Sequence, residues 1–334
     1  MEEVAPNIKS LEFTVHLDTL DCHILAPFIN LTKLEIIFNG FYDPPKLVRK
    51  LNNLSISSLE SFELAGVKDY PRPLIDADLM SLSSLRTVTF SFCRISSRTF
   101  ESIPDSVLLL NWNRSLIEFP GGVKRFRAPK QLKSFDLSIS HQPENFKQGW
   151  FPIVDTLDDY NLNHVSIEIH NITTLFDPIS LLQKLPKGIT SLDMIYSNEL
   201  VPYLGKPLTL NFSQFERLKH LLLRYCVTTT GAYHRTSLQC YNPLDLHCQP
   251  KSLETLELEI SPWSSLKNLP VENLHEIVLT SRGYNAARAS DAFPAISKLL
   301  SKVIHLERVV FEWSDDVIDL RWFDFAEAFG GRNV

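Results

Sequence analysis

The residues best suited to metal chemistry lie in one stretch between residues 227 and 250. It holds His234, Cys240, His247 and Cys248, and four side chains of these types bind zinc when they converge. Their spacing, H-x5-C-x6-H-C, matches no common zinc motif. We therefore expect an insertion that holds no metal, and the predicted set of cofactors is empty.

Thiol and acid–base chemistry have equally weak support. The stretch from Ser83 to Phe100 ends an alternating apolar run on a lone Cys93. The chain contains no G-x-S-x-G, H-E-x-x-H, phosphate-loop or C-x-x-C pattern. Its acidic residues recur at regular intervals instead of pairing as acid and base. The sequence therefore predicts a protein that is not an enzyme, with Cys93 in a structural role.

The amino-acid composition narrows the possible classes of protein further. The 334 residues are 44% hydrophobic and 22% charged, with a net charge of −6, which is ordinary for a globular domain. Phosphate backbones require a basic surface, so nucleic acid is an unfavourable ligand. The sequence has no apolar run of 18 residues and no apolar N-terminal leader. We expect no membrane association and a cytoplasmic or nuclear location.

A short template recurs along the whole chain: apolar, two variable residues, apolar, one variable residue, apolar. Twelve copies are spaced by 21 to 35 residues, with a mean near 27. They start at Ile8, Leu31, Leu59, Leu85, Val107, Leu132, Leu162, Ile189, Leu218, Leu253, Leu274 and Leu306.

Each copy predicts a short strand with one buried face, because alternate residues of a strand point the same way. A single strand cannot bury that face alone, whereas stacked copies form a continuous core. The segments 43–54, 177–185 and 292–303 carry helix signals and would return the chain to the next strand. The predicted fold is an α/β solenoid covering residues 1–334 as one domain. We expect a curved parallel sheet on its concave face, helices and loops on its convex face, and a C-terminal cap at 314–334.

The template resembles the leucine-rich repeat, L-x-x-L-x-L-x-x-N/C. Its ninth position holds Asn39, Cys93 and Cys226, and serine in five further copies. The cysteine copies are similar to those of F-box proteins, which recruit substrates to ubiquitin ligases. The resemblance implies a horseshoe of about twelve irregular repeats that binds a protein on its concave face. No F-box segment is visible, since the first copy begins at Ile8.

The third, fifth and seventh template positions should face outward from the strands. They carry ten acidic and three basic residues, a net charge of −7, which favours a basic protein partner. The predicted partner-binding residues are Glu35, Glu63, Thr89, Asn111, Asp136, Glu168, Asp193, Arg224, Glu257 and Glu259.

Two functions follow from this pattern. In the first, the chain is the substrate-recognition domain of an F-box-type ubiquitin ligase, and it meets Skp1 and cullin only if an F-box exists outside this chain. In the second, it is a scaffold or inhibitor that binds a protein without any ligase role. Two insertions, 141–161 and 227–250, and a basic cluster within 124–133 are further exposed segments without an assigned role.

Overall fold

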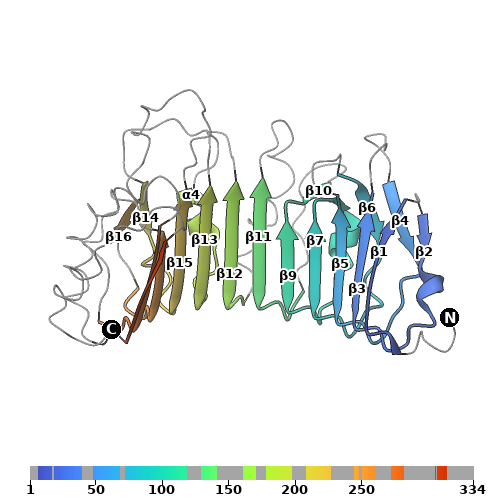
Figure 1. Cartoon of the computed structure of the whole chain (residues 1–334), viewed down its shortest axis with the longest axis horizontal. Coiled ribbons are helices and arrows are strands. Elements are labelled where there is room, and N and C mark those ends of the chain that lie inside the picture. Colours follow the sequence, from blue (N-terminus) through green and yellow to red (C-terminus); the bar gives the residue numbers. More distant parts are fainter. Residues whose placement is uncertain are drawn as a thin grey trace, which may run out of the picture. The chain divides into compact units, whose positions relative to one another are not determined.

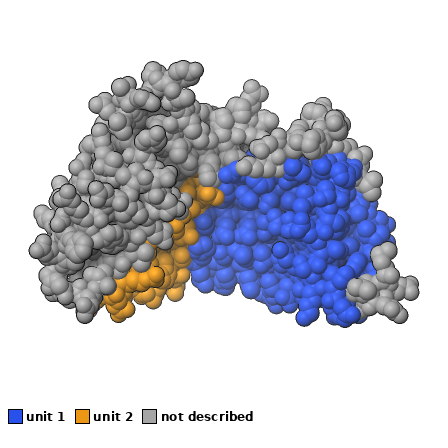
Figure 2. All heavy atoms as spheres, in the orientation of Figure 1, with its two compact units in different colours: residues 1–166 blue, residues 167–334 orange. Residues whose placement is uncertain are grey.

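The computed structural model describes twelve stretches of the chain (Figure 1). They are residues 7–16, 19–39, 48–67, 72–118, 129–140, 161–170, 178–197, 208–226, 244–247, 250–259, 272–281, and 305 with 307–313. The chain divides into two compact units, residues 1–166 and 167–334, which Figure 2 colours separately.

The first unit is built on parallel strands that lie side by side in chain order (Figure 1). The strands are β1 (Ser10–Val15), β3 (Lys33–Phe38), β5 (Ser61–Gly66), β7 (Thr87–Ser91), β9 (Leu109–Asn113) and β11 (Ser134–Ser140). Every one begins at the third position of a template copy. In β3, Leu34 and Ile36 occupy the fourth and sixth template positions and are fully buried, whereas Glu35 between them is partly exposed. The predicted parallel strands and their inward face are confirmed.

A second parallel sheet lies on the return side of the first unit. Its order is β10-β8-β6-β4-β2, and the strands are β2 (Thr19–Asp21), β4 (Val48–Asn52), β6 (Leu74–Ala77), β8 (Arg94–Ser96) and β10 (Leu116–Glu118). Five successive turns therefore carry two strands each, which makes the unit a parallel β-solenoid. Among the described residues on this side, the helical elements are the 3-10 helix η2 (Cys22–Leu25) and the one-turn helix α1 (Ser97–Glu101).

The helix predicted at 43–54 is wrong, because residues 48–52 form β4. Val48 and Leu51 stand three apart and suggest a helix. In the structure Arg49 and Leu51 are the inward pair, and Arg49 is only 2% exposed. Its guanidinium donates to the carbonyl of His16 at 3.1 Å. A buried arginine thus supplies the strand alternation that an apolar pattern does not reveal.

Hydrogen bonds join each turn to the next. Ser58 and Ser106, each just before a template copy, donate through Oγ to Leu31 O and Leu85 O, both at 2.8 Å. Inside, the Trp112 ring packs edge-on against Phe90 with centroids 5.0 Å apart, and its Nε1 donates to Ser115 O at 2.7 Å. The core therefore combines apolar stacking with satisfied polar groups.

The second unit repeats the parallel arrangement. Its main strands are β13 (Ser191–Ser197), β15 (His220–Cys226), β17 (Thr255–Glu259), β18 (Glu276–Ser281) and β19 (Arg308–Trp313). A separate pair joins β14 (Leu208–Asn211) to β16 (Leu244–His247). The helix predicted at 177–185 is present as α4 (Pro178–Lys184). The strand β12 (His164–His170) spans the division between the units along the chain.

Several predictions fall outside the described residues. These are the helix at 292–303, the cap at 314–334 and nearly all of both insertions. Within the described stretches, no helix has the length and apolar character needed to cross a membrane.

A pair of adjacent substitutions tests the register. Leu221 is 1% exposed in β15, so Leu221→Asp buries a carboxylate and should lower the free energy of unfolding by about 3 kcal/mol or more. His220→Asp, at the exposed position before it, should change that free energy by less than about 0.5 kcal/mol. Urea unfolding followed by circular dichroism measures both, and equal losses would contradict the register.

Candidate functional site

The fifth template positions of the first unit form a continuous row across the sheet. The strand registers place these six residues next to one another in the order Glu12, Glu35, Glu63, Thr89, Asn111 and Asp136. Neighbouring strands are about 4.8 Å apart, so each side chain lies beside its equivalent in the next turn. We call this set the outward row; it brings together five of the predicted partner-binding residues.

Three glutamates occupy one end of the outward row. Partial burial, followed by the charges of Glu63 and Glu12, raises the pKa of Glu35, and Lys33 offsets this only in part. Glu63 accepts a hydrogen bond from Ser91 Oγ at 2.8 Å. Among the described residues, Glu12 and Glu35 form no hydrogen bond or ion pair through their carboxylates. This end of the row is therefore a negative surface that Lys33 offsets only in part.

The other end of the outward row holds two neutral residues and one acid. Asn111 donates through Nδ2 to Thr89 Oγ1 at 3.2 Å. Asp136 Oδ1 lies 3.5 Å from His164 Nε2, and this contact is an ion pair only when the imidazole is protonated. Asn111 Oδ1 and Ser138 Oγ are buried atoms without a hydrogen-bond partner among the described residues. Negative charge thus concentrates on the first three turns.

Two outward acids of the second unit, Glu257 and Glu276, are paired with arginines of neighbouring strands. Its fifth positions run Asp193, Leu222, Glu257, Val278 and Val310. Arg224 donates from Nε to Glu257 Oε1 at 2.9 Å and makes a second contact to the same oxygen through Nη2. Arg308 pairs with Glu276 at 2.6 Å. The count of charges along the sequence includes Arg224 and Glu257, but it does not show that they are paired, because they lie 33 residues apart in the chain.

Two more of the predicted partner-binding residues, Glu168 and Glu259, lie on β12 and β17. Glu168 lies on β12, where it is partly exposed. Glu259 is the last residue of β17, and its side chain is outside the described set.

Cys93 is a buried structural residue of the first unit. Its Sγ lies 3.6 Å from Leu64 O in the preceding turn and 3.5 Å from Ser115 Oγ in the next. Ser115 Oγ also accepts from the Cys93 backbone N–H at 3.2 Å. Burial raises the pKa of the Cys93 thiol to about 12. Cys93 therefore links neighbouring turns, and its protonated, buried thiol is a poor nucleophile.

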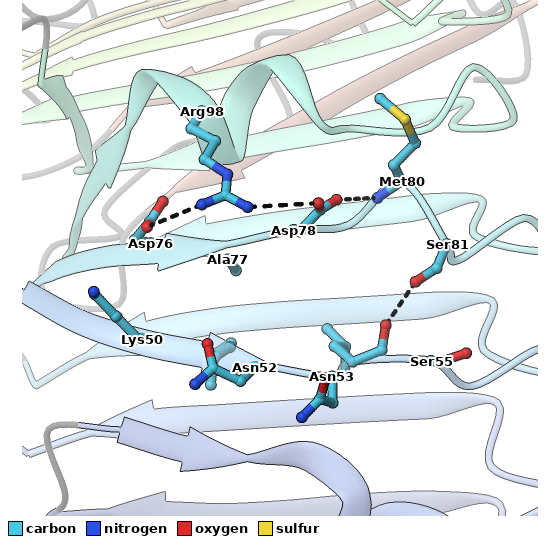
Figure 3. Close-up of a pocket in the computed structure, with 12 residues that line it drawn as sticks. Lys50, Asn52, Asn53, Ser55, Asp76, Ala77, Asp78, Met80, Ser81 and Arg98 are labelled. Carbon is cyan, nitrogen blue, oxygen red and sulfur yellow. Dashed lines mark hydrogen bonds and ion pairs between the residues drawn. The ribbon is translucent and has the colours of Figure 1, made fainter.

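A polar pocket of about 810 Å³ opens beside β4 and β6 (Figure 3). The Arg98 guanidinium reaches toward both Asp76 and Asp78, with N–O distances of 3.9 and 3.8 Å. Lys50 and Asn52 line the opposite wall. The two carboxylates are balanced by two cations, so the pocket has no net charge and no acid–base pair set apart from its neighbours. Exposed ion pairs of this kind contribute about 0–1 kcal/mol.

Metal ligands do not gather in the part of the chain that the structure describes, where no group of three or more His, Cys, Asp or Glu side chains could hold an ion. The predicted metal-free insertion at 227–250 lies almost wholly outside that part.

The fold defines the chain as a parallel β-solenoid protein. No family model, curated protein or solved structure matches it significantly.

The buried thiol gives a direct chemical test. Cys93 should resist iodoacetamide in the native protein at pH 8, because its raised pKa keeps the thiol protonated and the core excludes the reagent. Peptide mapping by mass spectrometry after a short pulse measures this, and labelling in urea shows that the residue can react. Native labelling at the rate of a free thiol would contradict the structural role.

Glu35 gives a test of the negative surface. The pKa of Glu35 is raised in the folded state, so the folded protein binds a proton at this carboxylate more readily than the unfolded chain does. The free energy of unfolding therefore falls as the pH rises from the ordinary glutamate pKa through the raised pKa of Glu35. Glu35→Gln removes a like charge between neighbours and should raise the free energy of unfolding at pH 7 by about 0.2–1 kcal/mol. At pH 3, where glutamate is protonated in both states, the difference should vanish.

The matched control is Glu60→Gln, at an exposed position off the outward row. It should be neutral at both pH values. An equal gain from both substitutions would show that the row carries no special repulsion.

Proposed function

We propose that this chain is a non-catalytic protein-binding module, and that its outward row in the first unit binds a basic segment of a protein partner. The supporting observation is the in-register stack of Glu12, Glu35 and Glu63 on adjacent turns. Like charges held side by side repel one another, and the carboxylates of Glu12 and Glu35 form no ion pair among the described residues. Lysine or arginine side chains of a partner would replace that repulsion with attraction.

The row also favours fast and selective association. A surface with one sign of charge steers an oppositely charged partner toward it and disfavours acidic ones. The pKa of Glu35 is raised in the free protein. A bound cation would stabilise the charged carboxylate and so lower this pKa. Binding should therefore be weaker at pH values low enough to protonate this residue.

We further assign the solenoid to the leucine-rich repeat class, as one domain of about twelve irregular repeats. Support comes from the main strands of both units, each of which begins at the third position of a template copy. It also comes from the ninth position, where Cys93 and Ser115 bond across neighbouring turns. The second sheet of short strands takes the place that helices hold in the pattern expected for this class.

Within that class, we propose the substrate-recognition domain of an F-box-type ubiquitin ligase. The observation behind this choice is the buried cysteine at the ninth position, the residue that the F-box resemblance rests on. The alternative is a scaffold or inhibitor that uses the same outward row without Skp1 or cullin.

Charge reversal tests the binding surface. The triple variant Glu12→Lys, Glu35→Lys, Glu63→Lys should lose its partners, and its affinity for a nonalysine peptide should fall at least tenfold. Affinity purification with mass spectrometry and fluorescence anisotropy of the labelled peptide measure these effects.

The control reverses three exposed acids away from the row: Glu60→Lys, Glu101→Lys, Glu272→Lys. It carries the same net charge, so it separates the site from the overall field. Equal losses in both triple variants would refute the outward row as the binding surface. The same purification, probed for Skp1 and cullin, decides between the ligase and the scaffold, since a clear absence of both favours the scaffold.

A further inference from the structure

The strand β1 lies at the edge of the first unit's main sheet (Figure 1). It pairs with β3 along one side, and no described strand pairs with its other side. The bonds at the two ends of this pair run from Lys33 N to Lys9 O at 2.9 Å and from Asn39 N to Val15 O at 3.1 Å. Along a parallel strand, alternate residues bond to the same neighbour, so the odd-numbered residues of β1 face β3. The even-numbered residues consequently direct their N–H and C=O groups toward the free edge.

The even-numbered residues of β1 are Ser10, Glu12 and Thr14, and all three are exposed. The counterparts of the last two in the next turn, Glu35 and Ile37, are only partly exposed. A row of unpaired backbone groups is a template for another strand, and proteins commonly block such edges with proline or with very short strands. Because β1 has six residues and no proline, its free edge can accept a strand.

The core layer beside this edge is incompletely covered. Leu11 and Phe13 hold the fourth and sixth positions of the first template copy. They are partly exposed, whereas their counterparts in β3, Leu34 and Ile36, are fully buried. A strand added to the edge would cover Leu11 and Phe13 with its own inward side chains. Apolar side chains at those positions would therefore stabilise the complex by removing apolar surface from water.

The outward face of the same edge is negative. Glu12 begins the outward row, with Glu35 and Glu63 next to it in the following turns. A lysine or arginine on an added strand, directly opposite Glu12, would have its Cβ about 5 Å from the Glu12 Cβ. The edge therefore fits a segment in which apolar and basic residues alternate.

A second copy of this chain fits the edge less well. Directly opposed residues of paired strands lie on the same face of the sheet, and the outward residues of β1 are Ser10, Glu12 and Thr14. Pairing two copies through β1 would thus place no base opposite Glu12, and it would join two acidic rows end to end. Charge complementarity favours a basic partner segment over a second copy.

We propose that the basic segment of the protein partner binds as an additional β-strand on the free edge of β1. Backbone hydrogen bonds to β1 supply affinity, and the alternating side chains supply specificity. The apolar side chains of the segment cover Leu11 and Phe13, and a lysine or arginine lies beside Glu12. The inference rests on the proposed function for the positive charge of the segment, whereas the addition of a strand depends on the backbone of β1.

Two peptides of identical composition test the added strand. Acetyl-Lys-Val-Lys-Val-Lys-Val-Lys-amide alternates its apolar and basic residues, and acetyl-Lys-Lys-Lys-Lys-Val-Val-Val-amide groups them. Calorimetric titration of the full chain at fixed ionic strength measures both affinities. The alternating peptide should bind more tightly by about tenfold or more, because it can place every valine inward and every lysine outward along β1. Equal affinities would overturn the inference.

A proline on β1 tests the backbone. Thr14→Pro removes an N–H group that faces the free edge and leaves the bonds to β3 intact. The affinity of this variant for the alternating peptide should fall by about tenfold or more.

The matched control is Ser57→Pro, at an exposed residue of the turn that Leu59 N closes on Ile56 O at 3.2 Å. Proline is favoured at the second residue of such a turn, so this variant should bind the alternating peptide like the wild type. Equal affinities of the two proline variants would overturn the edge of β1 as the binding site.

Nonalysine separates the added strand from the proposed function. Thr14→Pro retains every carboxylate of the outward row, so its affinity for nonalysine should match that of the wild type, which also shows that the variant is folded. If the wild type binds nonalysine but does not prefer the alternating peptide, the outward row stands and the added strand is overturned. A preference for the alternating peptide without nonalysine binding would support the added strand and overturn the outward row.

Sedimentation velocity tests the second copy as the occupant. The wild type should remain monomeric as its concentration rises. A concentration-dependent dimer that Thr14→Pro abolishes would overturn the partner segment in favour of a second copy.

Discussion

Register between successive turns is the constraint on which the rest of this structure depends. In the first unit, each template position pairs with the same position of the next turn, as Glu12 does with Glu35 and Glu35 with Glu63. Inward positions consequently stack apolar on apolar and exclude water, which supplies the main stabilisation of a solenoid. Outward positions stack in the same way, so any charge that recurs in the sequence becomes a row. The acidic surface is thus a direct product of the alignment that forms the core.

The same alignment makes the ends of the strands chemically distinct. A strand must leave the sheet at each turn, and the polar groups freed there require partners. Cys93 and Ser115 meet this need inside the turn by bonding across to Leu64 and to each other. One position earlier, Phe92 and Arg114 adopt left-handed backbone, which costs about 1–2 kcal/mol for a residue with a Cβ. Packing around Gly66 and the cross-turn hydrogen bonds of Phe92 N and Arg114 N offset that cost.

Sequence reasoning works well where the chain obeys a period and poorly where it does not. Leu34, Ile36 and their equivalents alternate strictly, so the strands and the outward row follow from the pattern. The strand β4 was missed because Arg49 takes an inward position that a hydrophobic pattern assigns to apolar residues. Short strands such as β8 and β10, with three residues each, contain too few alternations to predict.

The remaining features depend on contacts between residues that lie far apart in the chain. The Arg224–Glu257 pair requires the register of β15 against β17, so a charge count along the sequence does not show which outward acids are paired. The close packing around Gly66 is another example, because a Cβ there would stand 2.2 Å from Phe92 O and 2.9 Å from Pro73 Cδ. No spacing rule connects these three residues, and only the folded turns bring them together.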